Sequence, residues 1–185
     1  MPRRSDFKLG CIHGKLVPNV RSEEAWVRNQ LYLIGSLVVE QANIKLVAYE
    51  MPLSDSQARD SCIDLFGYDQ NRKPWIIELK KGNSTEHGEN IMGQLTGYDQ
   101  KFQTIRPYVE NEIRSVFHWP EFRFSKGTGL MLLAQKCFYE GSNRDLGLYS
   151  SRDIVCCSFR ENQTEILEKN QAGRISLAIE NSPNT

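Results

Sequence analysis

The chain lacks any apolar run long enough to cross a membrane. Its longest apolar stretches, Leu31–Val39 and Leu130–Ala134, are far shorter than the roughly 20 residues that a spanning helix requires. The opening residues Met1–Asp6 are not followed by an apolar segment, so no signal peptide is expected. These absences predict a cytoplasmic protein without a membrane partner.

The chain also lacks the cysteine and histidine spacing that is typical of zinc sites. It has five cysteines but no Cys-x-x-Cys, the adjacent Cys156 and Cys157 cannot bind one zinc in the usual spacing, and its three histidines are widely separated. We expect reduced, mostly structural thiols, as in a cytoplasmic protein. No P-loop, glycine-rich nucleotide fingerprint or Ser-His-Asp set is present, so no nucleotide cofactor is expected.

The chain has no excess of charge of either sign, because 23 basic residues balance 23 acidic residues. A strongly basic chain would have indicated nucleic acid by charge alone. Here any contact with nucleic acid must come from a local cluster or from a metal that neutralises phosphate. The 185 residues predict a single domain over residues 1–185, with an irregular lead-in at 1–20 and a frayed tail at 181–185.

The hydrophobic pattern predicts an α/β fold. A helix is expected from Ser22 to about Leu33, ended by Gly35, and a second helix over roughly Glu89–Thr104 with Ile91, Leu95, Tyr98 and Phe102 on its buried face. We expect a central mixed sheet of about five strands flanked by these helices. The predicted strands are Asn43–Glu50, Ser61–Tyr68, Trp75–Lys81, Gly129–Phe138 and Ile154–Phe159, with an edge strand within Arg174–Glu180.

The connections indicate how these strands pair. The first three are joined by short polar segments, which predicts an antiparallel meander. Gly129–Phe138 is almost continuously apolar, as a central strand covered on both faces should be.

Two acidic residues and a lysine interrupt the apolar strands of this meander. In a strand, side chains two apart share a face, so Glu78 and Lys80 project together while Ile77 and Leu79 point the other way. If the second and third strands pair across their short turn, Asp64 lies beside Glu78. The flanking residues are those of a core, so two carboxylates are expected to converge there.

Paired buried carboxylates repel each other, and a divalent cation removes that repulsion. Carboxylate oxygens suit Mg²⁺, which binds through one or two carboxylates together with a substrate phosphate, and Mn²⁺ can substitute for it. Such an ion stabilises charge that grows on a phosphoryl oxygen, and Lys80 adds a positive donor on the same face. The pattern therefore predicts metal-assisted hydrolysis of a phosphodiester.

The spacing of these residues resembles the D…(D/E)-x-K signature of the PD-(D/E)XK nuclease superfamily. Asp64 is followed after 13 residues by Glu78-Leu79-Lys80, and Gln94-Leu95-Thr96-Gly97-Tyr98 resembles the Q-x-x-x-Y element of RecB-like members. The apolar strand after the second helix is similar to that of NucS-like domains. The family's proline is missing, since Ile63 precedes Asp64. The resemblance covers roughly residues 22–138 and implies a restriction-endonuclease-like core.

The resemblance also implies roles for individual residues. Asp64, Glu78 and the helical acid Glu24 would hold the metal, and Lys80 would act on the nucleophile. Glu23 and Glu50 are alternatives to Glu24 as the auxiliary acid. The residues expected to orient the site or contact substrate are Gln94, Tyr98 and Lys81.

The implied function is a Mg²⁺-dependent nuclease that hydrolyses DNA, an endonuclease in repair, recombination or defence. The alternative is an inactive DNA-binding or protein-interaction module of the same fold, because this fold also has non-catalytic members. A homodimer would enlarge the contact with DNA, although no sequence feature requires one. Asp64, Glu78 and Lys80 also have a simpler interpretation, an ordinary strand face with a salt bridge worth about 0–1 kcal/mol.

Overall fold

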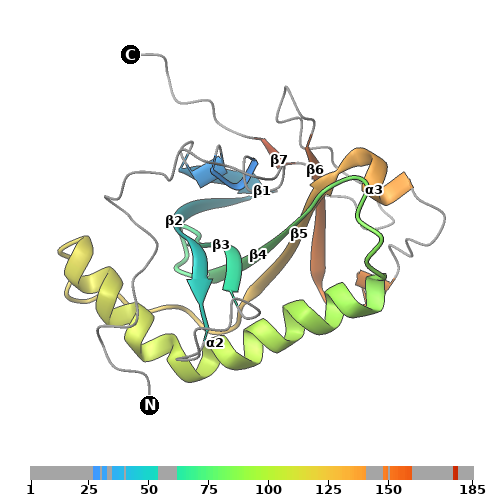
Figure 1. The fold of residues 1–185 in the computed structure, drawn as a ribbon. Helices are drawn as coiled ribbons and strands as arrows, with labels where there is room; N and C mark the ends of the chain where they lie inside the picture. Colours follow the sequence, from blue (N-terminus) through green and yellow to red (C-terminus); the bar gives the residue numbers. More distant parts are fainter. Residues whose placement is uncertain are drawn as a thin grey trace.

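The computed structural model describes residues 27–29, 31–32, 35–39, 41–53, 62–140, 148–149, 151–159 and 177–178. These residues form an α/β fold built on one mixed sheet. The long helix α2 (Gly88–Val116) runs along one face of the sheet, as Figure 1 shows. The predicted lead-in at 1–20 and tail at 181–185 lie outside the described residues.

The sheet has seven strands among the described residues, in the order β6-β5-β4-β3-β2-β1-β7. The strands β1 to β4 are successively antiparallel, which confirms the predicted meander, while β4, β5 and β6 are parallel. The parallel pair β4 and β5 is connected through α2, the usual arrangement for parallel strands. The strands are β1 (Ser36–Val39), β2 (Ala42–Pro52), β3 (Cys62–Tyr68), β4 (Pro74–Lys80), β5 (Gly129–Gln135), β6 (Ile154–Phe159) and β7 (Leu177–Ala178).

The sheet is larger than the expected five strands, mainly because the chain turns back directly after the first helix. Residues 27–29 and 31–32 are helical, and the N–H of Gly35 donates to the carbonyl of Leu31 over 3.1 Å. Gly35 has φ of 81°, a conformation that glycine adopts without strain and that commonly ends helices. The chain then enters β1, which the sequence analysis did not predict, and β7 pairs with it at the sheet edge.

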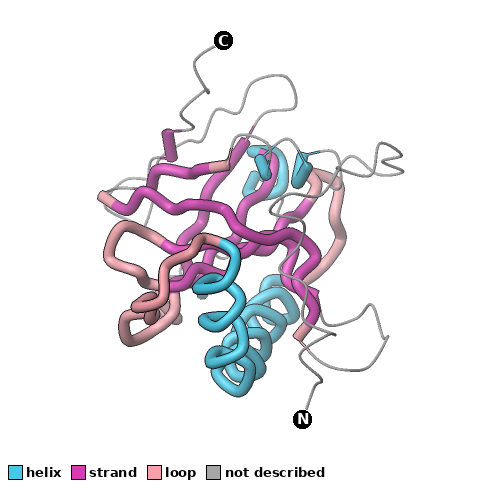
Figure 2. The backbone as a smooth tube through the Cα atoms, turned by 90° about the vertical axis from the view of Figure 1, so that its left-hand side faces the viewer, coloured by secondary structure: helices cyan, strands magenta, loops and turns pink. Residues whose placement is uncertain are grey.

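The two faces of the sheet form two separate hydrophobic cores. On one side, Ile76 and Phe66 pack with the buried face of α2, including Leu95 and Phe102. On the other side, Ile77 and Leu79 pack with Val27 and Leu31 of the first helix. Figure 2 shows α2 lying against the sheet from a second direction. Every residue of β4 is buried, so this strand occupies the centre of the fold.

The second helix extends past its predicted end at Thr104 to Val116 and contains Pro107. A proline inside a helix removes one hydrogen bond and costs about 3 kcal/mol. The apolar stripe nevertheless continues beyond it through Val109 and Ile113, both completely buried. Burial of these side chains offsets the cost, which the local pattern around Pro107 did not indicate.

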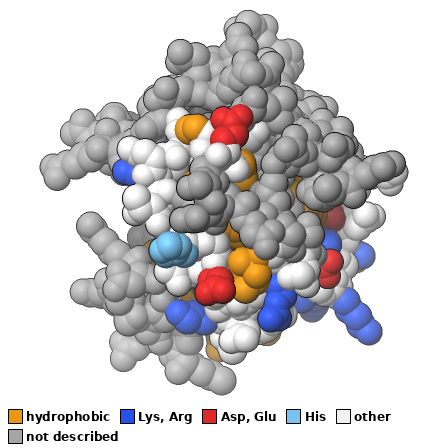
Figure 3. Space-filling model, turned by 90° about the vertical axis from the view of Figure 1, so that its right-hand side faces the viewer, with side chains coloured by type: hydrophobic (Ala, Val, Ile, Leu, Met, Phe, Trp, Pro, Cys, Tyr) orange, Lys and Arg blue, Asp and Glu red, His pale blue; other side chains and the backbone are white. Residues whose placement is uncertain are grey.

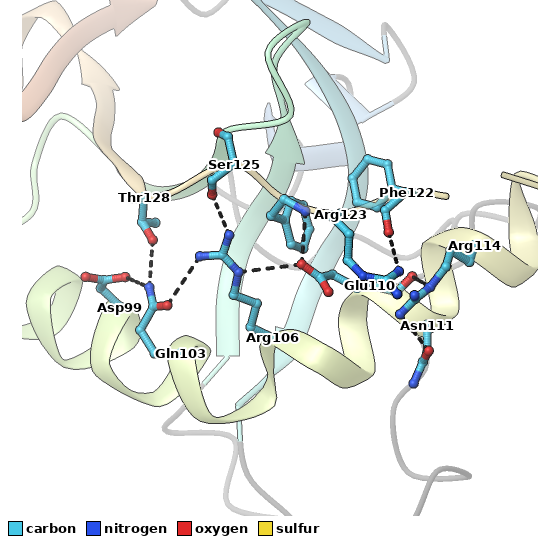
Figure 4. A network of polar contacts seen from close by, with 11 residues as sticks. Asp99, Gln103, Arg106, Glu110, Asn111, Arg114, Phe122, Arg123, Ser125 and Thr128 are labelled. Atoms are coloured by element: carbon cyan, nitrogen blue, oxygen red, sulfur yellow. Dashed lines mark hydrogen bonds and ion pairs between the residues drawn. The ribbon is translucent and has the colours of Figure 1, made fainter. Parts of the chain in front are cut away.

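A polar network fastens the second half of α2 to the segment that leads into β5 (Figure 4). Arg106 donates to the carbonyl of Ser125 and lies 3.6 Å from Glu110, whose carboxylate accepts a hydrogen bond from the Phe124 N–H. Gln103 donates to Thr128 over 2.9 Å. The guanidinium of Arg106 therefore has a structural role in attaching α2 to this segment.

The predicted strand Gly129–Phe138 is shorter than expected. It ends at Gln135, and the short helix α3 (Lys136–Glu140) follows directly. The hydroxyl of Tyr139 on α3 bonds to the carbonyls of Leu132 and Cys157, each over 2.8 Å. These bonds hold α3 back against β5 and β6.

Candidate functional site

Asp64 and Glu78 form a pair of carboxylates on neighbouring strands. The ladder between β3 and β4 ends with the pair Leu65 and Ile77, and Asp64 and Glu78 are the next residues of the two strands beyond that pair. Asp64 Oδ2 accepts a hydrogen bond of 2.8 Å from the Leu79 N–H. Because Ile77 and Leu79 belong to the opposite core, Glu78 projects toward the α2 side. A side-chain hydrogen bond with Glu78 is among the influences on Asp64, so the structure brings the two predicted carboxylates together.

Burial makes it energetically unfavourable for both carboxyl groups of this pair to be ionised. The side chain of Glu78 is 4% exposed and that of Asp64 is 20% exposed. Burial raises the pKa of Asp64, although the Leu79 N–H and the positive charges of Arg28 and Lys80 act in the opposite direction. The ionised form of Asp64 is therefore disfavoured in the folded protein.

Lys80 lies at the centre of the polar contacts around Glu78. Its Nζ is 2.7 Å from Glu78 Oε1, 2.9 Å from Glu86 Oε2 and 3.5 Å from Gln94 Oε1. Burial lowers the pKa of Lys80, but the two carboxylates outweigh it and the net pKa is raised. Lys80 is therefore a cation and a hydrogen-bond donor at neutral pH.

Gln94 and Tyr98 connect α2 to this lysine. They are one turn apart on the helix, and Gln94 Nε2 donates to Tyr98 Oη over 2.6 Å while Gln94 Oε1 accepts from Lys80. Burial and the nearby charge of Glu78 raise the pKa of Tyr98 to about 12, so its hydroxyl is neutral. The structure thus places both residues of the predicted Q-x-x-x-Y element beside Lys80.

Arg28 adds a second cation on the other side of the pair. Its Nη1 lies 3.0 Å from Glu50 Oε1 and 3.9 Å from Asp64 Oδ1, and its guanidinium carbon is 5.9 Å from the centre of the Tyr49 ring. Glu50 is 57% exposed and has φ of 45°. The site therefore connects the first helix, β2, β3 and β4.

Two of these residues were missed by the sequence analysis. Arg28 stands next to the buried stripe of the first helix, and Glu86 precedes the start of α2. Nothing in their local sequence distinguishes them from the charged residues that cover any surface. Only the tertiary fold brings Arg28 to Asp64 and Glu86 to Lys80.

The structure does not place the remaining predicted site residues in contact with the carboxylate pair. Glu24 and its alternative Glu23 fall outside the described residues. Lys81 is exposed directly after β4, and Glu50 is paired with Arg28. The roles expected of these four residues stay predictions.

The donor set is compatible with one divalent cation held by two carboxylates. Four carboxylates and two cations meet around the pair, so these described side chains carry a formal charge of −2; they are Asp64, Glu78, Glu50, Glu86, Lys80 and Arg28. Within the described ranges, however, no group of three or more His, Cys, Asp or Glu side chains is arranged to hold a metal ion. A metal bound here would take its other ligands from backbone, water or substrate, as Mg²⁺ commonly does.

Comparison of the chain with family models, with curated proteins and with solved structures finds no match. In the part of the chain that the structure describes, no helix combines the length and apolarity needed to cross a membrane. The functional interpretation therefore depends on the geometry of the site itself.

The Asp64→Asn variant is expected to melt at a higher temperature than the wild type at pH 7 in EDTA. Because burial raises the pKa of Asp64, the folded state binds a proton more readily than the unfolded state, and ionisation costs stability as the pH rises. The gain should shrink as the pH falls through the raised folded-state pKa of Asp64, and it should vanish below the unfolded pKa of about 3.9, where both states are protonated. Thermal unfolding followed by circular dichroism between pH 3 and 8 measures it.

Asp69→Asn is the matched control for this substitution. Asp69 accepts hydrogen bonds from the N–H groups of Asn71 and Lys73 and from the Trp75 indole, so its loss of charge should lower the melting temperature. A clear drop for Asp64→Asn as well would show that Asp64 is a structural group of the same kind.

Proposed function

We propose that this protein is a metal-dependent nuclease that hydrolyses DNA phosphodiester bonds, an endonuclease of repair, recombination or defence. The observation that carries the proposal is the pair of carboxylates Asp64 and Glu78 on neighbouring strands, with the Lys80 ammonium 2.7 Å from Glu78, at the edge of a hydrophobic core. The resemblance to the PD-(D/E)XK superfamily supports it. A restriction-endonuclease-like core is part of the proposal and agrees with the mixed α/β sheet.

Asp64 and Glu78 are the residues proposed to hold Mg²⁺. The Leu79 carbonyl adds an oxygen, because in a strand it points to the same side as the Leu79 N–H that bonds Asp64. Glu24 is retained as an auxiliary acid in the proposal. When bound, the cation would supply Lewis-acid stabilisation of negative charge on the phosphoryl oxygens. Its charge would also neutralise the excess of carboxylates around the pair.

Lys80 is proposed to act on the reacting phosphate as a fixed cation. Its raised pKa favours the protonated form at neutral pH, so in this proposal it donates hydrogen bonds to the attacking oxygen or to an oxygen of the pentacovalent phosphorus centre. Glu86 and Gln94 hold the ammonium group from the α2 side, and Tyr98 fixes the Gln94 amide. Lys81, exposed on the neighbouring position, is proposed to contact the substrate backbone.

The proposal is tested by measuring metal binding and cleavage together. The purified chain should cleave DNA in Mg²⁺ or Mn²⁺ and leave it intact in EDTA. Calorimetric titration should show Mn²⁺ binding to the wild type and at least about tenfold weaker binding to Asp64→Asn, because one charged oxygen ligand is lost. Single-stranded DNA, duplex DNA and RNA as parallel substrates define the substrate class.

Equal Mn²⁺ affinity in the wild type and in Asp64→Asn would contradict the metal assignment. Cleavage that persists in EDTA would contradict metal dependence. The control is Asp99→Asn on α2, a partly exposed carboxylate that accepts a hydrogen bond from Gln103 and should leave Mn²⁺ affinity unchanged.

A non-catalytic DNA-binding or protein-interaction module is the second candidate. The observation that favours it is that Lys80 forms ion pairs with both Glu78 and Glu86, as a lysine with a structural role does. Acidic and basic side chains of the described residues are interspersed on the face in Figure 3, in keeping with the net charge of zero. Such a surface attracts duplex DNA weakly without a metal. Absence of Asp64-dependent Mn²⁺ binding, together with absence of cleavage, would select this candidate.

A further inference from the structure

Arg28 places a permanent positive charge beside the carboxylate proposed to hold the metal. Its Nη1 lies 3.9 Å from Asp64 Oδ1, and its side chain is 13% exposed. A guanidinium group stays protonated throughout the physiological range. A divalent cation that binds Asp64 is therefore repelled by the charge of Arg28, and because Arg28 is largely buried, solvent weakens this repulsion only partly.

Arg28 also has hydrogen-bonding capacity that the described residues do not use. Its Nε is buried and has no hydrogen-bond partner among them. A buried N–H of a charged group without an acceptor is costly, and native proteins normally satisfy it. A phosphate cannot reach this buried Nε, but it can pair with the part of the guanidinium that meets solvent and neutralise its charge, because arginine binds phosphate through charge-assisted hydrogen bonds.

Glu50 competes with Asp64 for the ion pair with Arg28. Nη1 is 3.0 Å from Glu50 but 3.9 Å from Asp64, so the shorter ion pair is with the exposed carboxylate. Asp64 is thereby left with only a long contact to Arg28. It remains available to a second cation, while the positive charge stays close enough to oppose that cation.

We propose, on the basis of the proposed nuclease function, that Arg28 couples the binding of the divalent cation to the binding of the substrate phosphate. Without phosphate, Arg28 weakens metal binding at Asp64. A phosphate that pairs with Arg28 removes this repulsion, so metal and substrate favour each other's binding. Thermodynamic linkage requires the effect to be reciprocal. The site would thus be loaded fully with metal only when a phosphodiester is present.

The test is a set of Mn²⁺ titrations by calorimetry, with and without thymidine 5′-monophosphate, which contains no phosphodiester to cleave. Arg28→Met should bind Mn²⁺ alone about fivefold more tightly than the wild type, since a repulsive charge is gone. The nucleotide should tighten Mn²⁺ binding at least about fivefold in the wild type, a coupling of ordinary size. In Arg28→Met this enhancement should be at least halved.

Arg123→Met is the matched control, because it removes an exposed arginine that bonds only to the carbonyl of Phe122 among the contacts described. It should change neither the Mn²⁺ affinity nor the enhancement by nucleotide. Arg28→Lys keeps the charge and should keep the weak Mn²⁺ binding of the wild type. Arg28→Gln replaces Arg28→Met if circular dichroism shows that the latter does not fold.

Unchanged or weaker Mn²⁺ binding in the neutral Arg28 variants, or an undiminished nucleotide effect, would overturn the coupling. These outcomes are separate from failure of the nuclease proposal. If Asp64→Asn abolishes Mn²⁺ binding while the Arg28 variants behave as the wild type, the metal site stands and only the role of Arg28 is rejected. If Mn²⁺ binding does not depend on Asp64, the proposed function fails first.

Discussion

The Lys80→Met variant is expected to cleave DNA about a hundred- to a thousandfold more slowly than the wild type. This is the usual effect of removing one hydrogen-bond donor that stabilises negative charge in the transition state. The methionine keeps the length of the side chain but removes the ammonium that lies 2.7 Å from Glu78 and 2.9 Å from Glu86. Cleavage rates at saturating DNA and Mn²⁺ measure the effect, and calorimetry measures the metal.

Metal binding should respond in the opposite direction. Loss of a positive charge beside Glu78 removes competition for that carboxylate, so Mn²⁺ should bind Lys80→Met at least as tightly as the wild type. This combination, a slow reaction with an intact metal site, is the signature of a group that acts on the transition state. A purely structural salt bridge would leave the cleavage rate of the folded variant nearly unchanged, so the slow reaction is the part of the result that identifies a catalytic role.

Lys81→Met is the matched control, because it removes the same charge from the adjacent, exposed position. If Lys81 contacts the substrate backbone, its loss should raise KM and leave kcat nearly unchanged. Lys80→Met cleavage within about threefold of the wild-type rate, roughly 0.7 kcal/mol, would remove Lys80 from the reaction.

The sequence predicted the geometry of the carboxylate pair because that geometry is local. Asp64 and Glu78 belong to consecutive strands joined by the hairpin Asp69–Lys73, so only the register had to be inferred. Register is strongly determined here, since a shift of one residue would exchange Ile77 and Leu79 with Glu78 and Lys80 between the two faces. The i, i+4 spacing of Gln94 and Tyr98 was equally local.

The contributions of Arg28 and Glu86 were not predictable in this way. Arg28 reaches Asp64 from a helix that packs across the sheet, and the spacing of residues along the helix gives no information on that distance. Glu86 reaches Lys80 from the connection between β4 and α2, whose path depends on where α2 lies. Both contacts follow from tertiary packing, which a periodic pattern does not encode.

The predicted end of α2 was wrong for a related reason. Pro107, which is unfavourable inside a helix, lies three residues beyond the predicted helix end at Thr104. Val109 and Ile113 continue the buried stripe, and the hydrogen bond from the Phe124 N–H to Glu110 holds the helix beyond the proline. Packing of the whole element therefore outweighed the preference of a single residue.

The Phe102→Ala variant is expected to lose about 3–5 kcal/mol of unfolding free energy, as large truncations in a well-packed core do. Phe102 is completely buried, and its ring centre lies 5.1 Å from that of Phe66 and 5.8 Å from that of Phe124. It thus joins α2, β3 and the segment before β5. Chemical denaturation with urea, monitored by circular dichroism, gives the free energy directly.

Gln100→Ala provides the control on the exposed side of the same helix and should change the free energy by less than about 0.5 kcal/mol. A loss below about 1 kcal/mol in Phe102→Ala would mean that α2 is not held to the sheet through this aromatic contact. The helix α2 also carries Gln94 and Tyr98 to Lys80. We expect these contacts to persist in the molecules of Phe102→Ala that remain folded, so cleavage should slow only in proportion to the unfolded fraction. Lys80→Met should instead slow cleavage in a protein that remains fully folded, and the contrast between the two variants separates the support of the site from its chemistry.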